Sequence, residues 1–307
     1  MVNGTTLPVP SLSGAAYVLG EVEQEVAGLE GLAAKAASFR MALDSKLWGW
    51  GRFRRTARSI EELAIDTGLR TLQTAACAAS DVDAVIFCST RIPGGPDDHR
   101  EFIQTIFTGL GISNVCFVGV TLNRCANMLV ALRIAQALVR SESYRNVMVI
   151  TADRIDDEAI RMERFAVFSD GAASCLVSAN GGGYELVDSM TAQDMASAGW
   201  QNEISATLAR KVNDTIFERR NMSTSDVGRL LHANLYKPVV VMKERQAGFS
   251  MGQLFLGNIE RFGHCFAADP IINFVDHEAD AGLRPGQHCL LASSVPGLRA
   301  AVLLRKH

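Results

Sequence analysis

The sequence predicts an α/β protein made of two similar halves, each with a largely buried sheet. Short runs of consecutive apolar residues alternate along the chain with longer segments that have helical periodicity. This order is typical of a sheet whose two faces are covered by helices. Turn and strand residues of the first half recur in the same order in the second half, which indicates an internal duplication.

The elements of the first half follow from local signals. Helical periodicity runs over residues 59–78, and Ser59 with Glu62 has the spacing of a capping box at its start. A strand is expected over 82–88, and the Pro/Gly/Asp segment 93–98 is expected to form a loop. Beyond it we expect a helix over 102–110, a helix that begins near 123–125 and continues to 138, and a strand over 147–150.

The repeat sets the predicted domain boundary. Ser80-Asp81-Val82 before a strand reappears as Ser225-Asp226-Val227 before the apolar segment 229–233. The strand at 147–150 is matched by 289–292, and the glycine run 181–183 lies between the two copies. We therefore expect an N-terminal half over 1–180 that carries the nucleophile and a C-terminal half over 181–307 that carries the histidines.

The composition is that of an ordinary globular protein, because 48% of the residues are hydrophobic and 21% are charged. A net charge of −3 with interspersed signs argues against nucleic acid or anionic lipid as the main partner. No apolar run approaches the length of a membrane span, and residues 1–6 lack the features of a signal peptide. The seven cysteines form no CxxC pair and mostly lie in apolar runs, so we expect a cytoplasmic protein without a disulfide framework.

Cys125 is the candidate nucleophile. It lies where the apolar segment 117–122 gives way to the long amphipathic segment 123–138, so its thiol is expected in the first turn of a helix. Unpaired N–H groups and the helix dipole favour an anion there, and they stabilise a reactive thiolate. Free cysteine is also among the residue types most often buried in cores, so a structural role is the alternative.

The duplication indicates what Cys125 faces. Two similar halves packed face to face place equivalent loops around a shared central cleft, so Cys125 is expected to meet the segment around His264 from the other half. An imidazole beside a thiol can take its proton and later exchange a proton with a second substrate. Such a pair is suited to acyl transfer through a thioester intermediate.

Several segments carry a resemblance to a known family. They are the Cys125 helix, Phe168-Ser169-Asp170-Gly171-Ala172, His232-Ala233-Asn234, the segment 258–269 and the end Gly297-Leu298-Arg299-Ala300-Ala301. Together they resemble β-ketoacyl-acyl-carrier-protein synthase III of the thiolase superfamily, although Ser169 replaces a glycine and the His232 motif is one residue short. The resemblance implies a five-layered α-β-α-β-α thiolase-like fold, a homodimer, and coenzyme A or phosphopantetheinyl acyl carrier protein thioesters as substrates, with no other cofactor.

One departure from that family is informative. Histidine replaces the asparagine of the family's Tyr-Gly-Asn motif, and the segment from Gly263 to Asp269 resembles the Gly-His-x-x-Ala-x-Asp pattern of a divergent branch from antibiotic and polyketide pathways. Members of that branch use a Cys-His-Asp type triad for acyl transfer, which implies Cys125, His264 and Asp269 here. The alternative for Asp269 is a helix cap, because it directly precedes Pro270.

The resemblance also implies residues around the triad. His232 takes the place of the family's first histidine, as a candidate second catalytic imidazole, and Asn234 is a candidate substrate-binding neighbour. The alternative for His232 is a strand-end histidine bonded to the backbone. The backbone N–H groups of Cys125 and Gly297 are candidates for an oxyanion hole.

A basic and aromatic segment precedes the first long helix. Trp48 and Arg54 are candidates for holding a phosphopantetheine or coenzyme A phosphate, as such residues do in the family, and a solvated surface is the alternative. No spacing of histidine and cysteine typical of a zinc site recurs, and no metal site is expected.

We therefore expect an acyltransferase of the ketoacyl synthase III type, in which Cys125 carries an acyl group from a carrier-protein or coenzyme A thioester to a small-molecule acceptor in secondary metabolism. One alternative is a decarboxylative condensing enzyme that uses His232 and His264 to form a carbon–carbon bond with a malonyl thioester. The other is a non-catalytic partner subunit, and the retention of the cysteine and both histidines counts against it.

Overall fold

The computed structural model describes residues 8–92, 94–113, 115–179 and 181–307 of the protein. Its strands are β1 (Pro10–Leu19), β2 (Val22–Glu25), β3 (Arg52–Arg55), β4 (Ala84–Cys88), β5 (Cys116–Val120), β6 (Asn146–Asp153), β7 (Gly171–Ala179), β8 (Tyr184–Gln193), β9 (Val227–His232), β10 (His288–Val295) and β11 (Leu298–Lys306). Its α-helices are α1 (Leu32–Ser38), α2 (Ser45–Trp48), α3 (Ile60–Thr74), α4 (Pro96–Leu110), α5 (Asn127–Arg140), α6 (Thr207–Arg220), α7 (Lys237–Gln246), α8 (Gly257–Phe262) and α9 (Asp269–Asp280).

The predicted duplication is present in the strand order. The main sheet runs β5-β4-β6-β7-β1-β8-β11-β10-β9, and β2 pairs with β3 in a separate ribbon. In the first half β4 is parallel to β6, and β6-β7-β1 continue antiparallel; in the second half β9 is parallel to β10, and β10-β11-β8 continue antiparallel. The two halves join where β1 pairs with β8, through Ser11 with Glu185 and Leu12 with Tyr184.

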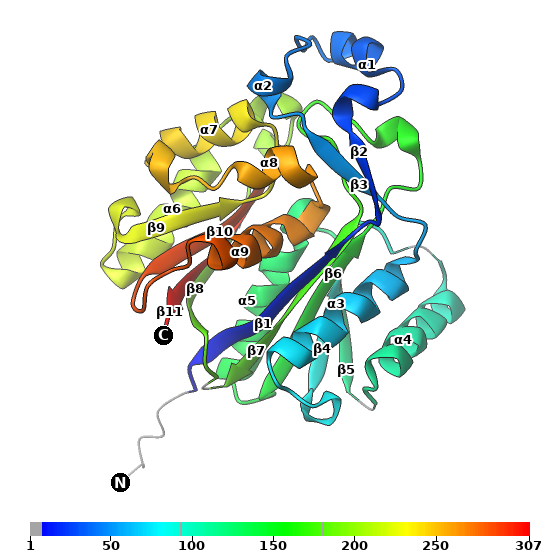
Figure 1. The fold of residues 1–307 in the computed structure, drawn as a ribbon. Helices are drawn as coiled ribbons and strands as arrows, with labels where there is room; N and C mark the ends of the chain where they lie inside the picture. The colour runs from blue at the N-terminus through cyan, green and yellow to red at the C-terminus, as the bar shows by residue number, and fades with distance from the viewer. Residues whose placement is uncertain (1–7, 93, 114, 180) are drawn as a thin grey trace.

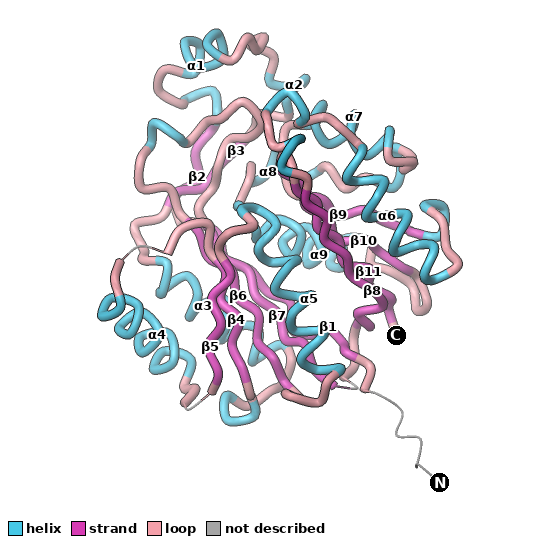
Figure 2. Tube along the Cα trace, turned by 180° about the vertical axis from the view of Figure 1, so that it is seen from behind, coloured by secondary structure: helices cyan, strands magenta, loops and turns pink. Residues whose placement is uncertain are grey.

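Helices and strands form the five layers that the resemblance implies (Figures 1 and 2). Helix α3, with α4 beside it, packs on β1, β6 and β7, while α6 packs on β8 and β11 at the opposite side of the molecule. Helices α5 and α9 lie between the two halves, because each contacts strands from both. Among the described residues, no helix has both the length and the apolar composition of a membrane span.

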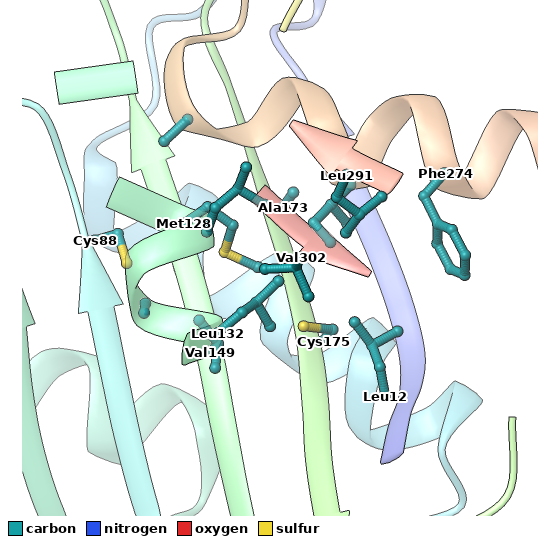
Figure 3. Packing of buried hydrophobic residues seen from close by; sticks show 14 of the residues in the cluster. Leu12, Cys88, Met128, Leu132, Val149, Ala173, Cys175, Phe274, Leu291 and Val302 are labelled. Carbon is teal, nitrogen blue, oxygen red and sulfur yellow. The ribbon is translucent and has the colours of Figure 1, made fainter. Parts of the chain in front are cut away.

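The central layer is held by apolar packing from both halves (Figure 3). Met128 and Leu132 of α5 share one buried cluster with Val149 of β6 and with Leu291 and Val302 of the second half. A helix enclosed between the two halves of the main sheet is expected to be apolar on most of its surface, and α5 meets this requirement. Burial on both sides fixes the start of α5, where Cys125 lies, relative to the second half.

The local predictions hold where a cap or an apolar run defines the element. Helix α3 begins with the predicted capping box, since the Ser59 hydroxyl accepts from the Glu62 N–H and the Glu62 carboxylate accepts from the Ser59 N–H. The loop predicted over 93–98 is partly wrong, because α4 already begins at Pro96. Proline is favoured in the first helical turn, and the Asp98 carboxylate accepts from the Gly95 N–H there. Pro93 lies outside the described residues.

Candidate active site

Cys125 lies in a 3-10 turn, Arg124–Ala126, between the carboxyl end of β5 and the start of α5. The residue before it is strained, because Arg124 has a φ of 52° without being glycine. Its guanidinium donates to the Pro296 carbonyl at 2.7 Å, which ties the turn to the β10–β11 hairpin. Asn127 ties it to the first half by donating to the Ser89 carbonyl at 3.0 Å. The turn that carries Cys125 is therefore held from both halves of the molecule.

His264 is placed by a close approach of two backbone segments. It follows α8 after Gly263, whose φ is 66°, and a Cβ on Gly263 would lie 2.7 Å from the Val167 carbonyl oxygen. Only glycine fits this position. The His264 N–H then donates to the Val167 carbonyl, and the His264 carbonyl accepts from the Ser169 N–H, each at 2.9 Å. The histidine backbone is thus paired on both sides with the segment before β7.

The structure brings Cys125, His264 and Asp269 into one hydrogen-bonded line. The His264 Nε2 atom lies 3.1 Å from the Cys125 sulfur, and His264 Nδ1 contacts the Asp269 carboxylate. Cys125 is 6% exposed, and neither His264 nor Asp269 has any exposed surface. This is the geometry in which a carboxylate orients an imidazole toward a nucleophile.

Asp269 is not the helix cap that was its alternative interpretation. Ala268 holds the N-cap position of α9, and Asp269 is the first helical residue. Its carboxylate accepts from the Cys265 N–H at 2.7 Å and from the Asn234 N–H at 2.6 Å, in addition to His264. These donors hold the carboxylate in one orientation in the buried site.

The surroundings of His264 favour its charged form. Burial opposes protonation, but the Asp269 carboxylate and the Cys125 sulfur raise the pKa of His264 to about 10. The ring packs against Phe168 at a centroid distance of 5.2 Å and against Phe266 at 6.0 Å. Apolar walls exclude water, so electrostatic interactions of the His264 ring in this site are weakly screened. The site is suited to a thiolate–imidazolium pair.

Asn234, predicted to contact substrate, instead supports Asp269. It is 2% exposed, its N–H donates to the carboxylate, and its side-chain oxygen accepts from Asn273 at 2.8 Å. Asn273 in turn accepts from Asn258 at 2.9 Å. A buried line of amides therefore runs from Asn258 to the triad. The predicted contact of Asn234 with substrate stays a prediction.

The backbone carbonyl of His232 accepts from Asn273 at 2.7 Å, but its ring has other partners. Its Nδ1 donates to the Ala233 carbonyl at 2.8 Å, so the proton of the neutral ring is on Nδ1. Its Nε2 lies 3.4 Å from the Glu244 carboxylate. Glu244 is held by Arg299, whose guanidinium donates to it at 2.6 Å. Burial, partly opposed by Glu244, lowers the pKa of His232 to about 3. The ring thus makes the backbone bond of the alternative interpretation, and its Nε2 has no hydrogen-bond partner among the described residues, so a catalytic role for His232 stays a prediction.

Gly297 lies in the turn between β10 and β11, next to the carbonyl that Arg124 contacts. Its φ is 76°, and a Cβ there would lie 2.8 Å from the Cα of Ala198. A close approach of another segment therefore requires glycine at this position. Its role in an oxyanion hole stays a prediction.

The two residues predicted to hold a phosphate have protein partners. The Arg54 guanidinium contacts Glu23, and the Trp48 indole N–H donates to the Ala42 carbonyl at 2.8 Å. Trp48 packs against Tyr236 with a centroid distance of 5.7 Å. These contacts join β2 to β3 and pack α2 against the start of α7, and a role of Trp48 and Arg54 in holding a phosphate stays a prediction.

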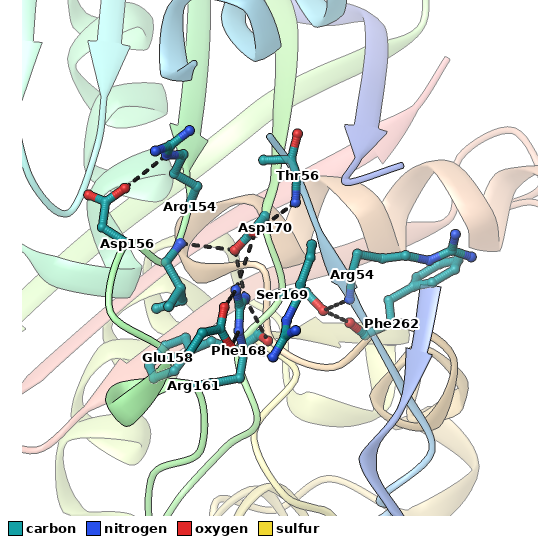
Figure 4. Close-up of polar contacts among 12 residues, drawn as sticks. Arg54, Thr56, Arg154, Asp156, Glu158, Arg161, Phe168, Ser169, Asp170 and Phe262 are labelled. Carbon is teal, nitrogen blue, oxygen red and sulfur yellow. Dashed lines mark hydrogen bonds and ion pairs between the residues drawn. The ribbon is translucent and has the colours of Figure 1, made fainter. Parts of the chain in front are cut away.

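A polar cluster beneath the site explains the serine that departs from the family pattern (Figure 4). The Ser169 hydroxyl accepts from the Arg54 N–H at 2.8 Å and donates to the Phe262 carbonyl, at the end of the helix that leads to His264. Asp170 is paired with Arg161 at 2.6 Å, and both are 1% exposed. Ser169 thus connects β3 to the His264 segment through a bond that glycine cannot make.

Sequence reasoning missed several residues of the site. Phe165 lies edge-on to His264 at 6.4 Å and stacks on Trp200, which is 41% exposed, at 4.7 Å. An aromatic contact therefore leads from the surface toward the triad. Asn127 and Asn273 are buried polar residues on apolar helices. An asparagine within an apolar helical segment was the signal in the sequence that could have identified them.

Comparisons with known proteins show which sequences and folds this chain is similar to. The family model for 3-oxoacyl-[acyl-carrier-protein] synthase III matches residues 121–195. A beta-ketoacyl-[acyl-carrier-protein] synthase III from Campylobacter fetus subsp. fetus is 27% identical over 195 residues, which cover 61% of this chain and 57% of that protein. The chain thus spans only a little over half of that relative's length.

Solved structures match over nearly the whole chain. ChlB3, described as an acyltransferase, has a TM-score of 0.83 and 14% identity over 97% of this chain and 98% of its own. Xanthomonas campestris OleA, solved with lauric acid and lauroyl-CoA, has a TM-score of 0.82 and 13% identity over 98% of this chain and 100% of its own. The chain is therefore similar in sequence to 3-oxoacyl-[acyl-carrier-protein] synthase III over part of its length, and it has the fold of these solved structures.

Proposed function

We propose that this protein is an acyltransferase that carries an acyl group as a thioester on Cys125 and passes it to an acceptor hydroxyl, amine or thiol. The observation that carries the proposal is the buried contact of His264 with Cys125 at 3.1 Å on one side and with Asp269 on the other. A histidine oriented by a carboxylate can act as a general base, which the asparagine of ordinary synthases cannot do.

In the first step the Cys125 thiolate adds to the carbonyl carbon of an acyl thioester. The bond to the donor sulfur then breaks, and that sulfur takes the proton of the His264 imidazolium. Acylation removes the negative charge of Cys125, which is one of the two charges that raise the pKa of His264. The imidazole therefore becomes a better match for proton transfer near neutral pH once the acyl group is in place.

In the second step neutral His264 accepts the acceptor's proton as the acceptor attacks the acyl carbon. The bond to Cys125 breaks, and the cysteine leaves as a thiolate beside the newly formed imidazolium. Backbone N–H groups of Cys125 and Gly297 are the proposed donors to the oxyanion in both steps. Asp269 keeps its negative charge throughout and holds the imidazole in the required tautomer.

Coenzyme A or acyl-carrier-protein thioesters are the proposed donors. The relatives are named for acyl carrier protein, and OleA was solved with lauroyl-CoA. ChlB3, described as an acyltransferase, supports transfer as the reaction. The divergent pattern with His264 and Asp269 supports a proposed role in polyketide or antibiotic biosynthesis. The alternative is decarboxylative condensation, which the synthase names of the relatives favour. The position of His232 beside Glu244 argues against it.

The test measures acylation and transfer separately. Intact-mass spectrometry after incubation with a panel of acyl thioesters reports the donor, and peptide mapping should place the acyl group on Cys125. Exchange of the acyl group onto N-acetylcysteamine then measures transfer. His264→Asn should slow this exchange by about 10²–10⁴-fold, whereas His288→Asn should not.

Carbon dioxide release from a malonyl thioester would instead support condensation. Unchanged exchange in His264→Asn, or a label mainly on Cys88, would overturn the proposal.

We also propose a homodimer in which β5 pairs with its copy in a second chain. β5 is the edge strand of the nine-stranded sheet, and Leu122 just beyond it is 89% exposed. An apolar sheet edge of this kind is a template for pairing with another chain. Light scattering of Leu122→Asp, compared with Leu43→Asp at an exposed position away from this edge, should show a shift toward monomer in the first variant only. A monomeric unmodified protein would contradict the assignment.

A further inference from the structure

The buried line of amides that begins at Asn258 continues to the surface of the molecule. The Arg261 side chain is 53% exposed, and its Nη1 donates to the Asn258 side-chain oxygen at 3.0 Å. The Asn258 amide donates to the Asn273 oxygen at 2.9 Å, and the Asn273 amide donates to the Asn234 oxygen at 2.8 Å. The Asn234 Nδ2 atom lies 3.4 Å from the Asp269 carboxylate, so the line joins an exposed cation to the triad.

The two ends of this line allow one direction of hydrogen bonding. A guanidinium can only donate and a carboxylate can only accept, so each amide must accept on the side of Arg261 and donate on the side of Asp269. The middle of the line fixes the same direction independently, because Asn273 Nδ2 also donates to the His232 backbone carbonyl at 2.7 Å. A carbonyl oxygen cannot donate, so the Asn273 amide cannot be turned around.

The aligned amides bring positive potential to Asp269. Each amide directs the oxygen end of its dipole toward Arg261 and the nitrogen end toward the carboxylate. The three asparagines are at most 2% exposed, so fields between them are weakly screened and their hydrogen bonds strengthen one another. The line meets Oδ1 of the carboxylate, whereas Oδ2 contacts His264. It therefore supports the carboxylate without competing with the imidazole.

The surface end of the line is held by other contacts. Arg261 also donates to the Asp276 carboxylate at 2.9 Å, and its guanidinium lies 4.6 Å from the centre of the Phe262 ring. These contacts fix the guanidinium where it meets Asn258, although much of the side chain faces water. A substitution of Arg261 can therefore remove the cation while the buried amides stay in place.

We infer that Arg261, Asn258 and Asn273 are positioning residues of the transfer step, which hold the Asp269 carboxylate charged and directed at His264. The assignment rests on the proposed acyl transfer, because it concerns the residue that orients the general base. It carries a sign as well. A positive potential near the imidazole favours the neutral ring, which is the form that accepts the acceptor's proton. Without the cation, His264 should keep its proton to higher pH.

The test reads the protonation of His264 by nuclear magnetic resonance of ¹⁵N-histidine-labelled protein. Cys125 is blocked as a methyl disulfide, so that its sulfur is uncharged as in the acylated form. The absence of one signal in His264→Asn identifies the residue. His264 is faced by Cys125, by Asp269 of α9 and by Asp153 of β6, and the variants below leave all three in place.

Two variants should raise the midpoint of this titration. Arg261→Met removes the cation and should raise it by about 0.5 pH unit. Asn258→Asp puts a carboxylate between Arg261 and Asn273 and should raise it by about 1 pH unit. The control is Asp276→Asn, which removes the other partner of Arg261 but leaves the line intact, so the midpoint should not rise. Arg261→Met changes an exposed side chain, so it tests the line even if Asn258→Asp does not fold.

Acyl exchange onto N-acetylcysteamine is the second readout. Below the midpoint it should slow about threefold in Arg261→Met and about tenfold in Asn258→Asp, and above it both should reach the unmodified rate. If the line has only a structural role, both variants slow exchange at every pH and the titration does not move. That result would overturn the inference, as would an equal rise in Asp276→Asn. A shifted titration with no exchange in the unmodified protein would support the line and refute the proposed function.

Discussion

Replacing Asp269 with asparagine removes one negative charge from the triad at nearly constant shape. The carboxylate accepts from the Cys265 N–H, the Asn234 N–H and His264 Nδ1. An asparagine oxygen can replace only one of the two carboxylate oxygens, so its amide group must face N–H donors on the other side. One or two buried donors therefore lose their acceptor, at a cost of about 1–3 kcal/mol in the free energy of unfolding.

The effect on transfer should be larger than the effect on stability. Asp269 is the foremost of the charges that raise the pKa of His264. Without it the imidazolium is no longer stabilised, and the tautomer that directs Nε2 toward Cys125 is no longer enforced. We expect transfer to slow by about 10³–10⁴-fold, which corresponds to about 4–5.5 kcal/mol in the activation barrier.

The assay compares acyl exchange rate and urea unfolding for Asp269→Asn and for Asp276→Asn. Asp276 lies on the same helix, is 8% exposed and accepts from Tyr17 at 2.8 Å, so it controls for the loss of a buried carboxylate. Only Asp269→Asn should combine modest destabilisation with near loss of exchange. A fully active Asp269→Asn protein would remove the triad, and the condensing alternative would then be the stronger one.

Three further changes test the network around the site. Because the pKa of His232 is lowered to about 3, only the unfolded chain takes up its proton between pH 7.5 and 5.0. As the pH falls over this range, His232 should lower the free energy of unfolding by about 2 kcal/mol. In urea unfolding of His232→Gln this part of the pH dependence should be absent. Ser169→Gly should lower both exchange rate and thermal midpoint, since the hydroxyl between Arg54 and Phe262 is lost, whereas Ser141→Gly on the surface should change neither. Arg161→Met leaves a buried unpaired carboxylate and should cost about 3–5 kcal/mol in urea unfolding.

Short-range signals in the sequence determined the elements and marked Cys125 as the candidate nucleophile. The capping box at Ser59 and the change from an apolar run to an amphipathic segment at Cys125 depend on residues a few positions apart. Backbone hydrogen bonding and helical or strand periodicity act over the same distances, so these elements can be predicted locally. The duplication was also readable, because repeated turn residues mark equivalent strands in both halves.

The tertiary structure alone decided which polar side chains meet. Asp269 before Pro270 fits a cap as well as a triad, and the direction of its carboxylate depends on Asn234 and Cys265, which the sequence does not place. His232 was assigned by motif position, yet its ring lies beside Glu244. Side-chain direction, burial and the partners that compensate a buried charge arise from packing between segments far apart in the chain. The contact of His264 with Cys125, which lie 139 positions apart, is of this kind.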